Sequence, residues 1–170
     1  MSTSNFILGG ARSGKSRRAL ALAESIGAAR IFIATAEAWD DEMAERIARH
    51  QAERGPGWST RETPLDLVVE FGRLDAQIDV CVVDCLTLWL SNLMHHGRDL
   101  EIETKRLCKA ISASEIPIIL VSNEVGLGIV PETPIGRAFR DAQGRLNQAV
   151  AHVCDRVEFV AAGLPLTLKG

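Results

Sequence analysis

The stretch FILGGARSGKSRRAL, from Phe6 to Leu20, indicates the fold of this chain. It begins as a strand-like apolar run, turns through glycines that end in Lys-Ser, and continues as a helix-like segment. Within it, Gly9 to Ser16 fits the pattern G-x-x-x-x-G-K-[ST], and a strand before it and a helix after it are the context that marks a phosphate-binding P-loop. A structural glycine turn that happens to precede Lys-Ser is the alternative. The pattern predicts a nucleotide site.

Each residue type in this loop suits a phosphate. Glycines let backbone N–H groups bend around phosphate oxygens, and a helix amino terminus adds the positive end of its dipole. We expect Lys15 to reach the β and γ phosphates in catalysis and Ser16 to bind a Mg²⁺ ion. The remaining question is which phosphate is transferred, and to what.

Composition places the chain among ordinary globular proteins. Its 170 residues are 46% hydrophobic and 24% charged, with a formal net charge of −3, which predicts a single domain over residues 1–170. The acidic balance and the lack of a basic stripe argue against a nucleic-acid partner. The opening residues MSTSN lack a signal-peptide pattern, and no apolar run is long enough for a membrane span, so we expect a soluble, cytoplasmic protein. The four cysteines are too few and too scattered for a zinc knuckle or a disulfide scaffold.

Short apolar runs alternate with helical patterns along the chain. The predicted strands are Asn5–Leu8, Arg30–Thr35, Val80–Asp84, Ile116–Asn123 and Arg156–Ala162. The predicted helices are Gly14–Ile26, Trp39–Arg54, Pro64–Arg73, Leu86–His95, Asp99–Ser114 and Ile135–Val153. Nearly continuous apolar strands are typical of a parallel sheet covered on both faces. The alternation predicts a three-layer α/β fold of the P-loop NTPase (RecA-like) kind, with a mainly parallel central sheet.

Asp84 closes the apolar run VCVVD. A P-loop normally works with a carboxylate at the end of a second buried strand, which orients the metal and its waters, and Asp84 occupies that place. Asp is also a favoured N-cap, so Asp84 could cap the helix that starts near Leu86. The two roles do not exclude each other.

His50 lies on a predicted helix where it continues an apolar stripe, since Met43, Ile47 and His50 fall at i, i+4 and i+7. A histidine in such a place is usually a hydrogen-bonded core residue or a solvated cation. The helix follows the strand Arg30–Thr35, whose carboxyl end we expect beside the P-loop. Neutral imidazole is a good nucleophile toward phosphorus, so catalysis by His50 is the second possibility.

The block VSNEVGLGIVPETPIGRAFRDAQGRLNQAVAHVCD holds further polar candidates. Glu124 follows a strand end, where it could contact substrate or metal or be a plain loop carboxylate. Arg137, Arg140 and Arg145 lie along the next helix, with Asp141 at i+4 from Arg137. Such charges usually form a solvated face with local ion pairs, and a phosphate clamp or subunit contact is the other interpretation.

Taken together, these segments resemble a known family. The P-loop is followed in order by IATAEAWDDEMAERIARHQAERG, TRETP, VVDCLTLWLSNL and VSNEVGLGIVPETPIGRAFRDAQGRLNQAVA. Over essentially its whole length the chain is similar to the bifunctional adenosylcobinamide kinases and adenosylcobinamide-phosphate guanylyltransferases of cobalamin biosynthesis. The SNEVGLGIVP block is far more specific than the P-loop.

The resemblance implies a two-step transferase that uses ATP or GTP with Mg²⁺. A kinase step would phosphorylate the aminopropanol hydroxyl of adenosylcobinamide. A second step would form a covalent guanylyl-histidine from GTP, release pyrophosphate, and pass GMP to adenosylcobinamide phosphate to give adenosylcobinamide-GDP. By match to the helix motif, that histidine is His50. The family also implies a homotrimer.

The resemblance further implies which residues surround the nucleotide. They are Gly9, Gly10, Ala11, Arg12, Ser13, Gly14, Lys15, Ser16, Ala34, Thr35, Ala36, Gln51, Ala52, Glu53, Arg54, Glu62 and Asp84. Ser16 and Asp84 would hold the metal, and Lys15 and His50 would be catalytic.

Two other hypotheses, each from a different functional class, compete with the two-step transferase. A P-loop small-molecule kinase without the transferase step would keep Lys15, Ser16 and Asp84 and have no use for His50. A noncatalytic nucleotide switch or a motor ATPase would need ordered switch loops or a nucleic-acid surface.

Overall fold

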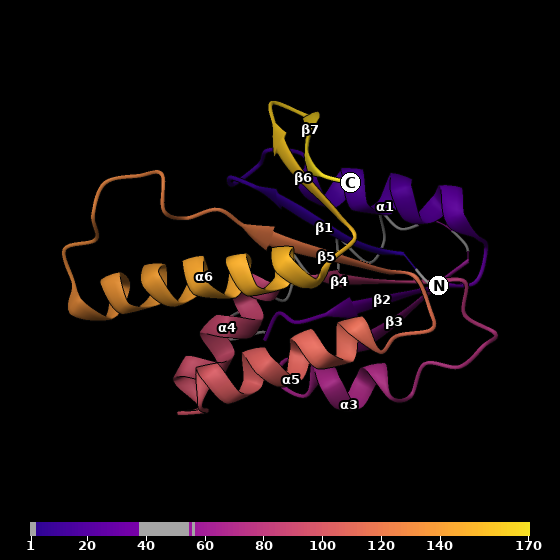
Figure 1. Cartoon of the computed structure of the whole chain (residues 1–170), viewed down its shortest axis with the longest axis horizontal. Helices are drawn as coiled ribbons and strands as arrows, with labels where there is room; N and C mark the ends of the chain where they lie inside the picture. The colour runs from indigo at the N-terminus through magenta and orange to yellow at the C-terminus, as the bar shows by residue number, and fades with distance from the viewer. Residues whose placement is uncertain (1–2, 38–54, 56) are drawn as a thin grey trace.

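A seven-stranded sheet forms the centre of the molecule (Figure 1). The computed structural model describes residues 3–37, 55 and 57–170, so the predicted helix Trp39–Arg54 lies outside the described residues. The strands are β1 Ser4–Gly9, β2 Arg30–Ala34, β3 Trp58–Glu62, β4 Val80–Asp84, β5 Ile118–Asn123, β6 Arg156–Ala161 and β7 Leu164–Lys169. Their order across the sheet is β3-β2-β4-β5-β1-β6-β7. The first six are parallel and β7 is antiparallel to β6.

Helices cover both faces of this sheet. They are α1 Lys15–Ile26, α3 Leu67–Phe71, α4 Leu86–His95, α5 Leu100–Ser112 and α6 Pro134–Val153. Ala19 and Ala23 of α1 pack on one face of the sheet, whereas apolar side chains of α3, α4, α5 and α6 pack on the other. Figure 1 shows α1 on one side of the sheet and α4, α5 and α6 on the other. The predicted three-layer, mainly parallel architecture is therefore confirmed.

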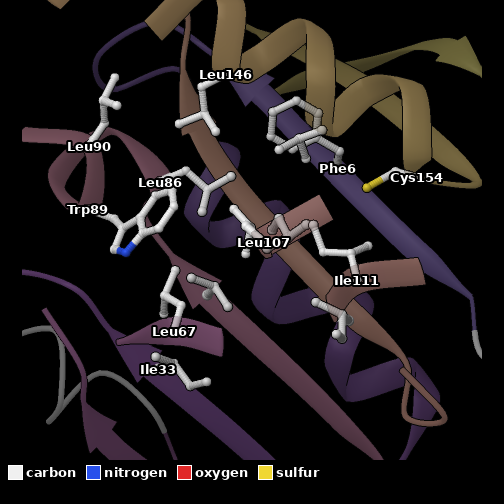
Figure 2. Close-up of a cluster of buried hydrophobic side chains, with 14 of the residues drawn as sticks. Phe6, Ile33, Leu67, Leu86, Trp89, Leu90, Leu107, Ile111, Leu146 and Cys154 are labelled. Carbon is white, nitrogen blue, oxygen red and sulfur yellow. The ribbon is translucent and has the colours of Figure 1, made fainter. Parts of the chain in front are cut away.

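The larger core lies between the sheet and the four helices α3 to α6 (Figure 2). Phe6, Trp89 and Leu107 are fully buried there, and the Trp89 indole donates a hydrogen bond of 2.7 Å to the carbonyl of Leu65. Because helices cover both faces, the inner strands bury side chains on both sides, which is why their sequences read as continuous apolar runs.

The two edge strands, β3 and β7, are absent from the sequence prediction. WSTRE in β3 is short and mostly polar, as is usual at a sheet edge, and among the described strands β3 pairs only with β2. LPLTLK in β7 contains Pro165, which counts against a strand unless it lies at a sheet edge. Several predicted ends also shift: the helix predicted over Pro64–Arg73 is limited to the five residues of α3.

The strand order corrects one expectation about the site. The carboxyl end of β2 was expected beside the P-loop, but β4 and β5 separate β2 from β1. Three strand spacings amount to about 14 Å. The order of strands depends on how the crossover helices pack, and a local pattern carries no information on that.

An ion pair fixes the start of α1 to β6. Glu158 is only 2% exposed, and its carboxylate accepts hydrogen bonds of 2.8 Å from both Nε and Nη2 of Arg18. Arg156 donates a third bond of 3.1 Å. The Arg18 guanidinium lowers the pKa of Glu158 below its usual range, against the opposing effect of burial. Since Arg18 follows the P-loop lysine by three residues, this pair anchors the helix that begins at the P-loop.

We expect Glu158→Gln to lower the free energy of unfolding by about 2 kcal/mol at pH 7, because it removes one partner of a buried pair. A carboxyl whose folded pKa is depressed stabilises the fold above its unfolded pKa, and this stabilisation is lost as pH falls through the folded pKa. The gap between wild type and variant should therefore begin to narrow below about pH 4 and close only once the pH is below the folded pKa. Urea unfolding from pH 7 to pH 3 measures it.

The matched control for this prediction is Glu101→Gln, because the Glu101 pair with Lys105 is exposed on both sides. It should change stability by less than about 0.5 kcal/mol. A Glu158 variant as stable as this control at pH 7 would contradict the prediction.

Candidate nucleotide site

The P-loop connects β1 to α1, and its glycines are required by geometry. Gly14 has a φ of +98°, and a Cβ there would lie 3.1 Å from the Cα of Gly163. A Cβ on Gly9 would lie 2.4 Å from Ser13 Oγ and 2.6 Å from the carbonyl oxygen of Val160. These close approaches explain why the loop sequence places glycine at both ends.

A pocket of about 800 Å³ opens over this loop. Its lining residues are Ala11, Arg12, Ser13, Gly14, Lys15, Ser16, Arg17, Asn123, Ala162 and Gly163. The structure thus brings most of the predicted P-loop residues together around one hollow. The turn between β6 and β7 forms part of the wall, held by a 2.8 Å hydrogen bond from the Gly163 N–H to the Ser13 carbonyl. Sequence reasoning missed this turn; the signal was Gly163 between two apolar runs.

The pocket is electropositive where a phosphate would bind. Lys15 is buried, and its ammonium donates a 3.0 Å hydrogen bond to the carbonyl of Gly10, which holds it over the loop. The residue before α1, Gly14, provides no side-chain cap, so the first N–H groups of the helix are available to an anion. A lysine together with open helix N–H groups is the arrangement that a phosphate requires.

Asp84 lies two strands from the P-loop and on its side of the sheet. In the parallel register Asp84 pairs with Val121, which pairs with Ile7 two residues before Gly9. Val82, two residues before Asp84, packs in the same cluster as α1, and alternate residues of a strand share a face. The Asp84 side chain therefore belongs to the face where the P-loop leads into α1. The alternative N-cap role is not what the structure shows, because the N-cap of α4 is Cys85.

The thiol of Cys85 is influenced by both site charges. Burial and, after it, the negative charge of Asp84 raise its pKa to about 11, while the positive charge of Lys15 acts in the opposite direction. Lys15 and Asp84 thus act on the same small region of the protein. A thiol with a raised pKa is mostly protonated at neutral pH, and this disfavours Cys85 as a nucleophile.

Ser16 and Asp84 are the residues here that could hold a Mg²⁺ ion. This ion is usually bound by one or two carboxylates and by phosphate oxygens of the substrate, with several waters retained. Ser16 lines the pocket at the first turn of α1, and Asp84 ends β4 on the same side of the sheet. A hydroxyl, a carboxylate and two phosphate groups would provide the required oxygens.

The predicted segment Ala34–Ala36 lies at the end of β2, away from the pocket. Thr35 is fully buried. Its hydroxyl donates a 2.7 Å hydrogen bond to the Cys85 carbonyl and accepts a 2.8 Å hydrogen bond from the Cys85 N–H. Its carbonyl accepts a 2.7 Å bond from the Asn92 amide. Thr35 therefore joins the ends of β2 and β4 and carries no polar group toward the P-loop pocket.

Glu62 is separated from the P-loop by the width of four strands, about 19 Å. It is exposed at the end of β3, where it pairs in register with Ala34. The structure does not bring it together with the residues that would hold the phosphates. Any contact of Glu62 with a nucleotide is with a part remote from that pocket.

The remaining predicted positions lie outside the described residues. They are His50, Gln51, Ala52, Glu53 and Arg54, and their roles stay predictions. After the carboxyl end of β2, the described residues stop at Glu37 and resume at residue 55 and then from residue 57 onward. The segment that contains them connects β2 to β3.

The loop after β5 begins at the P-loop. The Glu124 N–H donates a 3.0 Å hydrogen bond to the Gly9 carbonyl, while its carboxylate accepts a 2.6 Å bond from the N–H of Gly126. Arg137 donates to the carbonyls of Pro131 and Glu132, so it fixes the end of this loop. Asp141 pairs with Arg140 at 3.1 Å, as expected of a charged helix face with local ion pairs.

Residues 5–168 match the protein family described as cobinamide kinase / cobinamide phosphate guanyltransferase. The bifunctional adenosylcobalamin biosynthesis protein CobP of Pseudomonas aeruginosa is 48% identical over 98% of this chain and 97% of its own length. The CobU proteins of Salmonella typhimurium and Escherichia coli, which carry the same bifunctional description, are 37% and 35% identical. Each match covers 96% of this chain and 98% of the relative.

Two solved structures share the fold at low sequence identity. The flagellar accessory protein FlaH of Methanocaldococcus jannaschii aligns with a TM-score of 0.55 and 12% identity, covering 98% of this chain and 78% of its own. A KaiC-like protein of Pyrococcus horikoshii aligns with a TM-score of 0.51 and 13% sequence identity, and the alignment covers 92% of this chain and 71% of that protein's chain. At such identities the likeness concerns the fold alone, and it confirms the predicted RecA-like class. Within the described residues, no helix combines the length and apolar character needed to cross a bilayer.

Proposed function

The chain belongs to the cobinamide kinase / cobinamide phosphate guanyltransferase family, and on that premise we propose that this enzyme phosphorylates adenosylcobinamide and then converts the product to adenosylcobinamide-GDP. The observation that carries the kinase half is the P-loop pocket with its buried Lys15. Near-complete matches to bifunctional relatives support the combination of both activities in this chain.

In the kinase step the aminopropanol hydroxyl of adenosylcobinamide attacks the γ-phosphorus of ATP or GTP. The new O–P bond forms as the bond to the β,γ-bridging oxygen breaks; the nucleoside diphosphate leaves, and the hydroxyl proton passes to solvent. Lys15 and the N–H groups of α1 bind the phosphates and offset the charge that gathers on them. Ser16 and Asp84 would hold Mg²⁺, which supplies electrostatic stabilisation of the phosphate oxygens when bound.

In the second step we assign the nucleophile to His50, by its place in the family motif. An imidazole nitrogen bonds to the α-phosphorus of GTP, and pyrophosphate leaves. The phosphate of adenosylcobinamide phosphate then displaces the imidazole and takes the GMP group. A P–N bond keeps enough transfer potential for this exchange, so no further activation is needed. Gln51–Arg54 and Glu62 remain proposed nucleotide contacts.

The direct test is to incubate the protein with adenosylcobinamide, Mg²⁺ and GTP and to follow the products by chromatography and mass spectrometry. We expect adenosylcobinamide phosphate first, then adenosylcobinamide-GDP with one pyrophosphate released per product. Accumulation of the phosphate alone would favour a small-molecule kinase that lacks the transferase step. Triphosphate binding with neither product would contradict both activities.

We propose that a single domain over residues 1–170 carries both steps and that it assembles as a homotrimer in the cytoplasm. Several aliphatic side chains are exposed and would be available for contacts between subunits. Leu127 and Ile129 are 83% and 98% exposed on the loop before α6, and Leu164 is 73% exposed on the edge strand β7. Light scattering after size-exclusion chromatography tests the trimer.

A further inference from the structure

Four large aliphatic side chains are exposed over a short stretch that follows β5. Leu127 and Ile129 are 83% and 98% exposed, Val130 is 57% exposed, and Ile135, in the first turn of α6, is 71% exposed. The first three belong to the β5–α6 loop, residues 124–133, which extends beyond the end of β5 and away from the sheet (Figure 1). Single exposed aliphatic residues are ordinary. Four of them so close together in the sequence indicate a contact surface.

Both ends of the β5–α6 loop are tied to the rest of the protein. At its start, the Glu124 N–H donates a 3.0 Å hydrogen bond to the carbonyl of Gly9 in the P-loop. At its end, Arg137 donates hydrogen bonds of 3.0 Å and 2.7 Å to the carbonyls of Pro131 and Glu132. A ligand that covers the exposed side chains therefore has to order less of the backbone than it would on a loop with free ends.

The β5–α6 loop leaves the sheet where the terminal phosphate of a nucleotide would lie. β5 lies between β1, which leads into the P-loop, and β4, which ends at Asp84, and its last residue, Asn123, lines the pocket. A P-loop lysine reaches the β and γ phosphates, and a Mg²⁺ ion bridges their oxygens. With Lys15 on one side and Asp84 on the other, the γ-phosphate would lie toward the end of β5. An acceptor that attacks this phosphate would therefore approach along the loop.

The proposed acceptor has the chemistry that this loop would bind. Only the hydroxyl of its aminopropanol arm has to enter the pocket, so the bulky corrin ring stays at the rim. The ring carries methyl groups along its edge, and the acceptor is a cation, because the charge of Co(III) exceeds that of its corrin and adenosyl ligands. The loop supplies aliphatic side chains and the carboxylates of Glu124 and Glu132. Within the described residues, neither carboxylate has an ion-pair partner.

We propose that the four exposed aliphatic side chains bind the corrin ring of adenosylcobinamide and so place the acceptor hydroxyl at the phosphate pocket. This inference rests on the proposed kinase step. A second copy of the chain is the competing occupant of the same side chains. The corrinoid is favoured because the loop starts at the P-loop itself, where the acceptor has to arrive, and because its carboxylates complement a cation. Ligand sites generally combine many apolar side chains with a few polar groups, as this loop does.

The first experiment measures the binding of adenosylcobinamide by calorimetry in the presence of Mg²⁺ and a non-hydrolysable ATP analogue. The test variant combines Leu127→Ser with Ile129→Ser, and the matched control is Ile102→Ser in α5, where the isoleucine is 55% exposed. We expect the Kd for adenosylcobinamide to rise at least about tenfold in the double variant, because two apolar contacts with the ring are lost. The control and the Kd for the ATP analogue should match wild type. A Kd for adenosylcobinamide within about twofold of wild type would overturn the proposal.

Kinetics and oligomeric state separate the corrinoid from a second subunit. Loss of a contact that the substrate keeps throughout the reaction raises KM and leaves kcat unchanged, so the KM for adenosylcobinamide should rise about tenfold at a wild-type kcat. Light scattering should give wild type and double variant the same mass. A lower mass for the variant would identify the loop as a subunit contact and overturn the proposal. If the double variant does not fold, Ile129→Ala and the same measurements decide.

The failure of this inference is distinct from the failure of the proposed function. Wild type that binds and phosphorylates adenosylcobinamide, with a loop variant that behaves like wild type, would contradict the loop assignment alone. Wild type that neither binds nor phosphorylates adenosylcobinamide would contradict the kinase step, and the loop assignment with it.

Discussion

Replacing Lys15 by alanine is expected to lower kcat/KM of the kinase step by about 10³ fold, or roughly 4 kcal/mol of transition-state stabilisation. The lysine is buried in the pocket wall, and its ammonium is already held over the P-loop by the Gly10 carbonyl. Its charge is therefore preorganised and little screened by water. Steady-state kinetics with adenosylcobinamide and ATP measure the loss.

The control for this prediction is Lys109→Ala, an exposed lysine of α5 that should leave the rate unchanged. Lys15→Arg should recover little, because a planar guanidinium does not replace a compact ammonium in a tight loop. The thermal unfolding midpoint of each variant separates lost chemistry from lost folding. A Lys15→Ala rate within tenfold of wild type would remove this residue from the catalytic assignment.

Replacing His50 by alanine is expected to abolish covalent guanylylation. Wild type incubated with Mg²⁺ and GTP labelled at the α-phosphate should retain label on the denatured chain, and a phosphoramidate is lost in acid and kept in alkali. The variant should show only background label, since the proposed nitrogen nucleophile has been removed. Its kinase step should remain, because Lys15, Ser16 and Asp84 are intact.

The exposed His152 near the end of α6 supplies the matched control, and His152→Ala should label like wild type. Label that persists in the His50 variant would transfer the nucleophile to another residue. No label on folded, GTP-binding wild type would contradict the covalent mechanism. A P-loop small-molecule kinase without the transferase step would then be the better hypothesis.

The two predictions differ in what supports them. Lys15 was found from a local pattern; the structure shows it buried in the wall of the P-loop pocket, and its roles in phosphate binding and catalysis stay predictions. His50 depends on family membership, because it lies outside the described residues. The strand that precedes His50 in the sequence, β2, was expected beside the P-loop. That expectation is wrong, because β4 and β5 lie between β2 and β1.

By itself, the sequence determined the fold class, the P-loop and most elements, because these depend on short-range chemistry. A tight turn at Gly9 and Gly14, an apolar strand before it and a helix after it are specified within about 15 consecutive residues. Membership of the enzyme family follows from segments in a fixed order along the chain, which needs no spatial information.

Only the tertiary structure decided the strand order, and with it which strand ends meet at the pocket. It placed Asn123 between the P-loop and Asp84, added the turn at Gly163 to the wall, and separated Glu62 from the phosphates. Each of these results depends on which crossover helix packs on which face, an outcome of contacts between residues more than a hundred positions apart. Local sequence patterns do not encode such contacts, since they arise only when the whole sheet is assembled.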